Sequence, residues 1–116
     1  MYDGVERRRY PRLNRSFLVH YPVADGESQL DLSQVKNISL GGVLFLTTRP
    51  YEKESNIPLR IKLPGAYVEP QARVIESRQI EGGSFFDTRL EFLPMEQFDR
   101  EHIAQVLQHY IEGASG

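Results

Sequence analysis

The chain has 116 residues, of which 40% are hydrophobic and 26% charged, with a net charge of −2. These proportions are those of an ordinary soluble globular domain, and the length fits one domain. The absence of cysteine excludes disulfides, thiolate metal sites and cysteine nucleophiles, and it favours a cytoplasmic location. The net charge argues against a general nucleic-acid coat, and no apolar stretch approaches the ~20 residues that membrane insertion needs.

Six short runs rich in aliphatic and aromatic residues follow one another, separated by turn residues such as Asp25-Gly26 and Pro64-Gly65. Their hydrophobic residues alternate with polar ones, most clearly at Ile57, Leu59, Ile61 and Leu63 and more loosely at Leu30, Leu32, Val35 and Ile38. This period of two predicts strands with one buried face. The predicted strands span residues 16–21, 30–38, 43–48, 57–63, 67–79 and 85–93.

After Pro94 the hydrophobic residues recur at helical spacing. The predicted buried stripe consists of Phe98, Ile103, Val106, Leu107, Tyr110 and Ile111. We expect a C-terminal helix within residues 94–113, with Gly113 as its stop.

Six short strands followed by one amphipathic helix predict a mainly β fold, a six-stranded antiparallel β-barrel over residues 16–93 with a C-terminal α-helix over one opening. Closing the sheet would remove the exposed edges that short strands otherwise leave. Composition alone does not distinguish this barrel from an OB-like or an SH3-like one.

The first 15 residues form a basic arm, expected to be flexible. Five arginines face only Asp3 and Glu6, so the arm carries about +3 and the rest of the chain about −5. Arginine can bond a phosphate, or guanine O6 and N7, with two parallel hydrogen bonds, and its flat face stacks on purines. Pro11 biases the residue before it towards an extended conformation. The arm therefore suits a small anion, although a solvated basic tail or a nucleic-acid-binding arm would have the same composition.

A second polar motif, Asn37-Ile38-Ser39-Leu40-Gly41-Gly42, lies where the second predicted strand turns into the third. Asn and Ser offer short polar groups to a base edge, while Gly adopts φ > 0 freely and lets a ligand approach the backbone. Read by itself, the motif could equally be ordinary turn chemistry.

Together, the two motifs resemble the signature of the PilZ family, which binds the bacterial second messenger cyclic di-GMP. In that family the signature reads Arg-x-x-x-Arg followed by Asp/Asn-x-Ser-x-x-Gly. Arg8 and Arg12 match the first part, and Asn37, Ser39 and Gly42 match the second. The resemblance covers nearly the whole chain from Glu6 to the helix and implies the same barrel.

The resemblance also implies which residues bind the ligand. These are Arg8, Arg12, Asn37, Ser39 and Gly42, to which we add Gly41 and the flanking arginines Arg7 and Arg9. Because four arginines can neutralise more than the two charges of one cyclic di-GMP, we expect up to two ligands per chain. Arg78, near the end of a strand, is a further candidate that no motif position supports.

We therefore interpret the chain as a stand-alone, non-enzymatic cyclic di-GMP receptor whose arm becomes ordered on binding and is then recognised by an unidentified effector protein. No cofactor, metal site or catalytic group is expected, since no metal-ligand spacing or nucleophile motif is present. Two alternatives remain: a small barrel that binds single-stranded nucleic acid through the arm, and a scaffold without ligand. The sequence does not indicate the process that the protein controls.

Overall fold

A computed structural model describes residues 17–22 and 30–115, and for residues 30 and 110–115 it describes the backbone alone. In this part of the chain there are eight strands followed by one helix, α1 (Gln97–Ser115). The strands are β1 (Leu18–Pro22), β2 (Leu30–Ile38), β3 (Gly42–Thr47), β4 (Asn56–Pro58), β5 (Arg60–Leu63), β6 (Ala66–Val68), β7 (Gln71–Gln79) and β8 (Phe86–Phe92).

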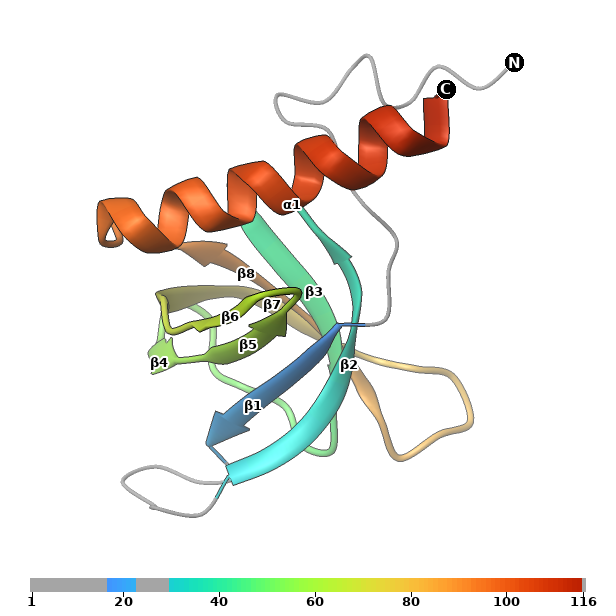
Figure 1. Cartoon of the computed structure of the whole chain (residues 1–116). Helices are drawn as coiled ribbons and strands as arrows, with labels where there is room; N and C mark the ends of the chain where they lie inside the picture. The colour runs from blue at the N-terminus through green and yellow to red at the C-terminus, as the bar shows by residue number, and fades with distance from the viewer. Residues whose placement is uncertain (1–16, 23–29, 116) are drawn as a thin grey trace.

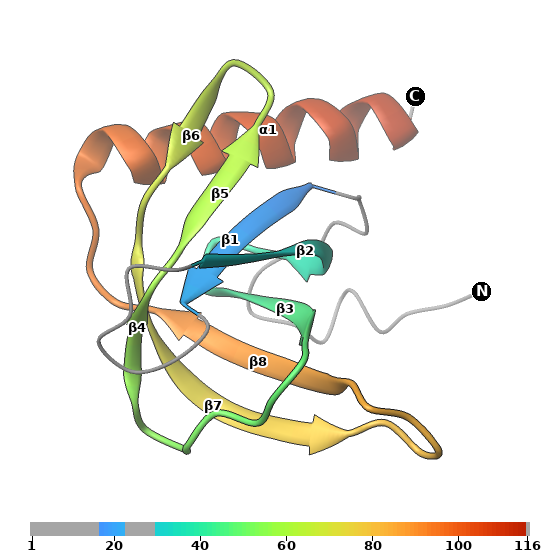
Figure 2. The ribbon, with the colours of Figure 1, turned by 90° about the horizontal axis from the view of Figure 1, so that it is seen from below.

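All eight strands join one antiparallel sheet in the order β4-β7-β8-β3-β2-β1-β5-β6. Only Leu59 separates β4, at one edge, from β5, near the other edge. The sheet must therefore curl until its two sides meet at this residue. Figures 1 and 2 show the curl, with α1 lying across one end of it. The prediction of a mainly β, antiparallel fold with a C-terminal helix is confirmed.

The predicted count of six strands is wrong, because two of the expected strands are each broken in two. The run 57–63 is interrupted at Leu59, and the run 67–79 at Glu69 and Pro70. The two breaks lie together, since the Leu59 N–H donates to the Pro70 carbonyl at 2.9 Å. Pro70 has no N–H of its own for a ladder. The chain bends at both places, which lets β5 and β6 pair with each other while β4 and β7 pair on the other side.

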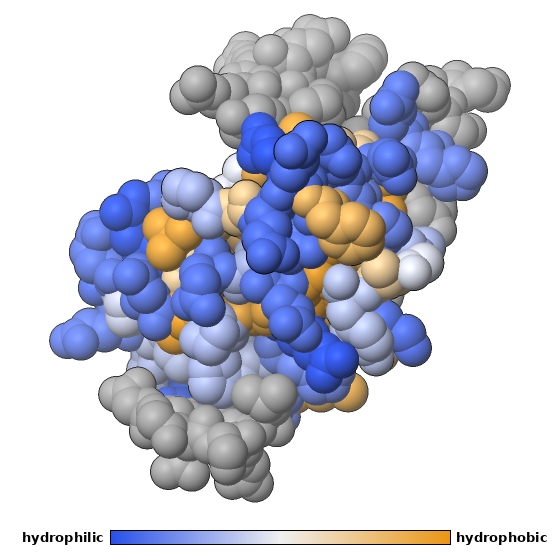
Figure 3. Space-filling model, turned by 60° about the vertical axis from the view of Figure 1, so that its left-hand side comes forward, coloured by the Kyte–Doolittle hydropathy of each residue, from blue (hydrophilic) through white to orange (hydrophobic). Residues whose placement is uncertain are grey.

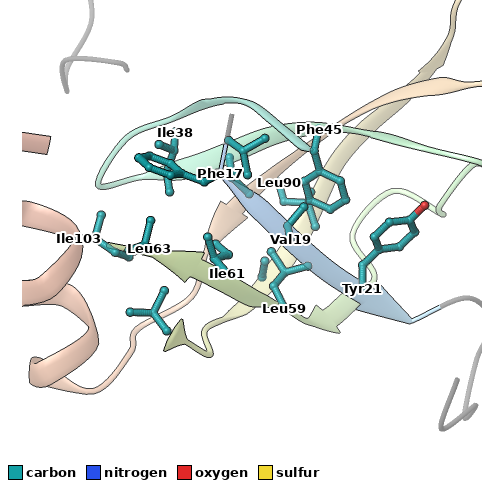
Figure 4. Close-up of a cluster of buried hydrophobic side chains, with 14 of the residues drawn as sticks. Phe17, Val19, Tyr21, Ile38, Phe45, Leu59, Ile61, Leu63, Leu90 and Ile103 are labelled. Carbon is teal, nitrogen blue, oxygen red and sulfur yellow. The ribbon is translucent and has the colours of Figure 1, made fainter. Parts of the chain in front are cut away.

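The core lies inside the curl and under α1. Val19, Phe45 and Ile61 are fully buried there and come from three different strands. Figure 4 shows these side chains pointing into one cluster with Leu63 and, from α1, Ile103. Alternation along β3 and β5 buries every second residue, as expected of strands with one wet face.

The loose alternation expected along β2 fails at Leu32, whose side chain is 51% exposed. The register between β2 and β3 shifts between Val35 and Asn37, which marks a β-bulge. A bulge adds one residue to one strand. The alternation that places Ile38 on the inner face is therefore shifted by one residue on the N-terminal side of the bulge. Val35 is buried in consequence, and Leu32 falls on the outer face.

The helix begins at Gln97 and ends at Ser115, so it starts later than expected and continues past Gly113. Ile103, Val106 and Leu107 are buried as predicted. Phe98 is not, because it lies at the edge of the stripe in the first turn, stacked on His102. The predicted stripe positions Tyr110 and Ile111 lie outside the side chains that the structure describes.

Figure 3 views the molecule from the side where α1 begins, and its hydrophobic side chains appear as separate patches among hydrophilic ones. Phe98 is 63% exposed. No helix among residues 17–22 and 30–115 is both long and apolar enough to cross a membrane.

Candidate functional site

The polar motif occupies the turn between β2 and β3, as predicted. The Ser39 N–H donates to the Gly42 carbonyl at 2.9 Å, which closes the turn. The Ser39 Oγ accepts from the Gly41 N–H at 3.1 Å, a local bond that Ser commonly makes in turns. The Ser39 hydroxyl hydrogen takes no part in this contact and can still donate to a ligand.

Gly42 is required by packing rather than by a left-handed backbone. A Cβ atom built on Gly42 would lie 2.2 Å from the Leu90 carbonyl oxygen and 3.2 Å from the Glu91 Cα of β8. Among the described glycines, a positive φ occurs at Gly65 and Gly82, not in this turn. The freedom of glycine to adopt φ > 0 is therefore not what this turn uses. Glycine is needed here because β3 and β8 approach each other too closely for a side chain.

An open groove of about 210 Å³ runs beside this turn on the outer face of the sheet. Asn37, Ser39, Gly41 and Gly42 all line it, so the structure brings together four of the eight predicted site residues. The groove is smaller than the ~300–1,000 Å³ of ordinary small-molecule sites. Its described walls alone would hold only part of a ligand with two bases and two phosphates.

The remaining predicted residues, Arg7, Arg8, Arg9 and Arg12, lie outside the residues that the structure describes. Their part in the site stays a prediction. The described part of the chain begins at Phe17, however. The Phe17 carbonyl accepts from the Val35 N–H at 2.7 Å, two residues before Asn37 on β2.

Arg89 is a groove residue that the sequence motifs missed. It lies on β8, where its neighbour across the ladder is Leu44 of β3, and both line the groove with Asn37. Alternation along β8 places Arg89 on the outer face, but only the strand register places it beside the turn. Arg78, the additional arginine considered above, does not line the groove. Its side chain is 75% exposed and is paired with Glu76 at 3.0 Å.

Comparison with known proteins identifies the family. The model of the family described as PilZ domain matches residues 6–109, which is most of the chain. The chain belongs to the PilZ family. A search of curated proteins finds no match.

Solved structures share the PilZ fold with this chain. The Bacillus subtilis inhibitor of motility MotI/DgrA is 18% identical, with a TM-score of 0.75 over 91% of this chain and 52% of that one. The K. pneumonia MrkH–c-di-GMP complex is 18% identical, with a TM-score of 0.76 over 94% and 54%. YcgR from Escherichia coli in complex with c-di-GMP is 13% identical, with a TM-score of 0.75 over 94% and 48%. This chain spans about half the length of these proteins, and identities this low establish the fold alone.

The groove contains the chemistry of a polar recognition site. Asn37 offers both a donor and an acceptor on its amide, and Arg89 offers only donors. Within the described residues, no group of three or more His, Asp or Glu side chains could hold a metal ion. Ion pairs surround the groove, including Lys36–Asp87 at 3.0 Å, and such exposed pairs each add about 0–1 kcal/mol to stability.

Proposed function

We propose that this PilZ domain is a non-enzymatic receptor for cyclic di-GMP. The observation that carries the proposal is a groove beside the β2–β3 turn, which Asn37, Ser39, Gly41 and Gly42 line together. Three of these, Asn37, Ser39 and Gly42, are the motif positions that the family signature assigns to the ligand. Membership of the family and the likeness to YcgR and MrkH, whose structures hold c-di-GMP, support the same ligand.

The turn provides contacts for a base edge, and the arm provides arginines for the phosphates and for guanine. Phe17 is fixed on β2 close to Asn37, and Arg12 is only five residues before it. Five extended residues span up to about 18 Å, which is enough for Arg12 to reach the groove from Phe17. The arm arginines would complete a site that the described groove forms only in part. In such a barrel, β4 and β5 would be the two halves of one of the six strands expected from the sequence, and β6 and β7 the two halves of another.

We further propose that the arm docks beside the turn when the ligand binds, and that an effector protein recognises the docked form. Docking the arm costs conformational entropy, which the attraction between arginines and phosphates offsets. A ligand pair carrying four charges would suit Arg7, Arg8, Arg9 and Arg12 better than a single molecule. Replacing Arg7 by Ala should then lower the number of bound ligands more than it lowers the affinity of the first.

Isothermal titration of the full chain with cyclic di-GMP, with cyclic di-AMP and GTP as comparison ligands, tests the proposal. Bidentate arginine contacts to guanine are worth about 1–3 kcal/mol, so Arg8→Ala and Arg12→Ala should each weaken binding roughly tenfold to a hundredfold. Asn37→Ala should weaken it by a smaller factor.

Arg15→Ala is the matched control, because it removes the same charge from the same arm at a position outside the motif. It should change affinity far less than Arg8→Ala. Absence of cyclic di-GMP binding, or equal losses in all three arginine variants, would contradict the proposal. Binding of single-stranded RNA or DNA in place of cyclic di-GMP would instead favour a nucleic-acid arm.

A further inference from the structure

Arg89 occupies a defined place in the outer face of the sheet. The strand register aligns Asn37 of β2 with Leu44 of β3, Leu44 with Arg89 of β8, and Arg89 with Glu76 of β7. Three of these four residues line the groove, with Arg89 between the apolar Leu44 and the polar edge of β7. The position is rigid, because β8 is an interior strand paired on both sides.

Each acidic neighbour of Arg89 is bonded to a different cation. Asp87, two residues earlier on β8, pairs with Lys36 at 3.0 Å. Glu91, two residues later, pairs with Arg73. Glu76, directly across the ladder, pairs with Arg78 at 3.0 Å. In the part of the chain that the structure describes, Arg89 itself is in no ion pair, so its guanidinium donors are available to a ligand in the groove.

An apolar side chain, Ile75, faces the groove beside Arg89. Ile75 points outward because it follows buried Val74 in the alternation of β7, and it lies in a β-bulge, since the register of β7 shifts between Val74 and Glu76. Its side chain is 38% exposed and lines the groove with Leu44. Bulges beside functional sites often redirect a side chain towards a ligand. Ile75 and Leu44 together offer an apolar surface to the flat face of an aromatic ring.

We propose that Arg89 is a specificity-determining residue that binds the O6 and N7 atoms of one guanine, while Ile75 and Leu44 contact the face of that base. The inference rests on the proposed function and names which part of the ligand this groove takes. The two acceptors of guanine match the two parallel donors of a guanidinium, whereas adenine presents a donor where guanine has O6. On this assignment the phosphates are left to the arginines of the arm.

The experiment is titration of Arg89→Gln and the unchanged chain with both cyclic di-GMP and cyclic di-AMP. Loss of a bidentate guanine contact should weaken cyclic di-GMP binding roughly tenfold to a hundredfold and leave cyclic di-AMP binding unchanged or stronger, because Gln pairs with adenine. Arg89→Met, which keeps the length of the side chain without its donors, should show the same loss for cyclic di-GMP. Thermal unfolding of both variants verifies that they are folded.

Arg60→Gln is the matched control, since it removes one arginine of β5 that is paired with Glu69 and does not line the groove. It should leave both affinities unchanged. Equal weakening of both ligands by Arg89→Gln would assign Arg89 to a phosphate and overturn the inference, as would unchanged selectivity. Both of those results leave the proposed receptor function intact. An unchanged chain that does not bind cyclic di-GMP overturns the receptor function and this inference together.

Discussion

The two ends of strand β3 use hydroxyl groups in opposite ways. At its start, Ser39 lies in a half-exposed turn, and its hydroxyl accepts one local N–H while its hydrogen remains available. At its end, Thr47 is fully buried, and its hydroxyl bonds to the Arg49 carbonyl at 2.7 Å and to Thr88 at 2.9 Å. Thr88 in turn bonds to Ser77 at 2.7 Å. Burial decides the role, because a buried hydroxyl must use its bonding capacity inside the protein and an exposed one can offer it to a ligand.

Gly42→Val should produce the largest effect at either end. The new Cβ would meet the Leu90 carbonyl of β8 at 2.2 Å, and backbone atoms cannot move aside as a flexible side chain can. Overpacking of this kind typically costs about 1–3 kcal/mol. We therefore expect a large drop in the free energy of unfolding, measured by denaturant titration, with weaker ligand binding as a consequence.

Gly83→Ala is the control for this substitution. Its added Cβ would meet the Ile80 carbonyl at an ordinary 3.6 Å, so its stability should barely change. A Gly42→Val protein as stable as the unchanged chain, yet unable to bind, would show that the glycine serves the ligand and not the contact between strands.

Thr88→Val and Ser39→Ala should separate the two ends of β3. The first removes the bonds to Thr47 and Ser77 inside the protein, which typically costs about 1–3 kcal/mol, and should leave ligand affinity unchanged. The second removes one bond in a half-exposed turn, so it should cost less stability and should weaken ligand binding. Unfolding and binding measured on both variants provide the test. A larger loss of affinity in Thr88→Val than in Ser39→Ala would reverse the assignment.

Much of this architecture was predictable because its signals are local. Alternation marked the strand runs, and Asn, Ser and Gly marked the β2–β3 turn, since these patterns depend on residues close together in sequence. The breaks at Leu59 and Pro70 were missed. They depend on one another across the sheet, and a run such as 57–63 alternates in the same way whether or not it bends.

Site residues outside the motifs were missed for the same reason. Arg89 enters the groove only because β8 pairs with β3 in a register that sets it against Leu44. Ile75 faces outward by the alternation of β7, but no residue of that strand signals the bulge beside it, which sets Glu76 opposite Arg89. The exposure of Leu32 likewise follows from the bulge in β2. Register and bulges are properties of paired strands, so a single strand's sequence does not show them.

The smallest effect should be a dependence of stability on alkaline pH at the buried end of β3. Burial raises the pKa of Tyr21, and the nearby carboxylate of Asp31 raises it further. The Tyr21 hydroxyl donates to Asp31 at 3.2 Å, and its ring packs 5.3 Å from that of Phe45. The folded state therefore holds the phenol proton more tightly than the unfolded state, where the pKa is about 10.

The sign follows from proton linkage. Below pH ~10 both states are protonated, and the contribution of Tyr21 to stability is fully present. Above it the unfolded state loses the proton first, so the free energy of unfolding should fall as pH rises from about 10 towards the higher pKa of the folded state. Denaturant unfolding of the unchanged chain and of Tyr21→Phe at several pH values isolates the contribution of Tyr21 ionisation to the free energy of unfolding, because the other tyrosines titrate in both proteins. The difference in stability between the two proteins should shrink above pH ~10. A difference that stays constant across that range would mean that Tyr21 ionises as easily in the folded chain as in the unfolded one.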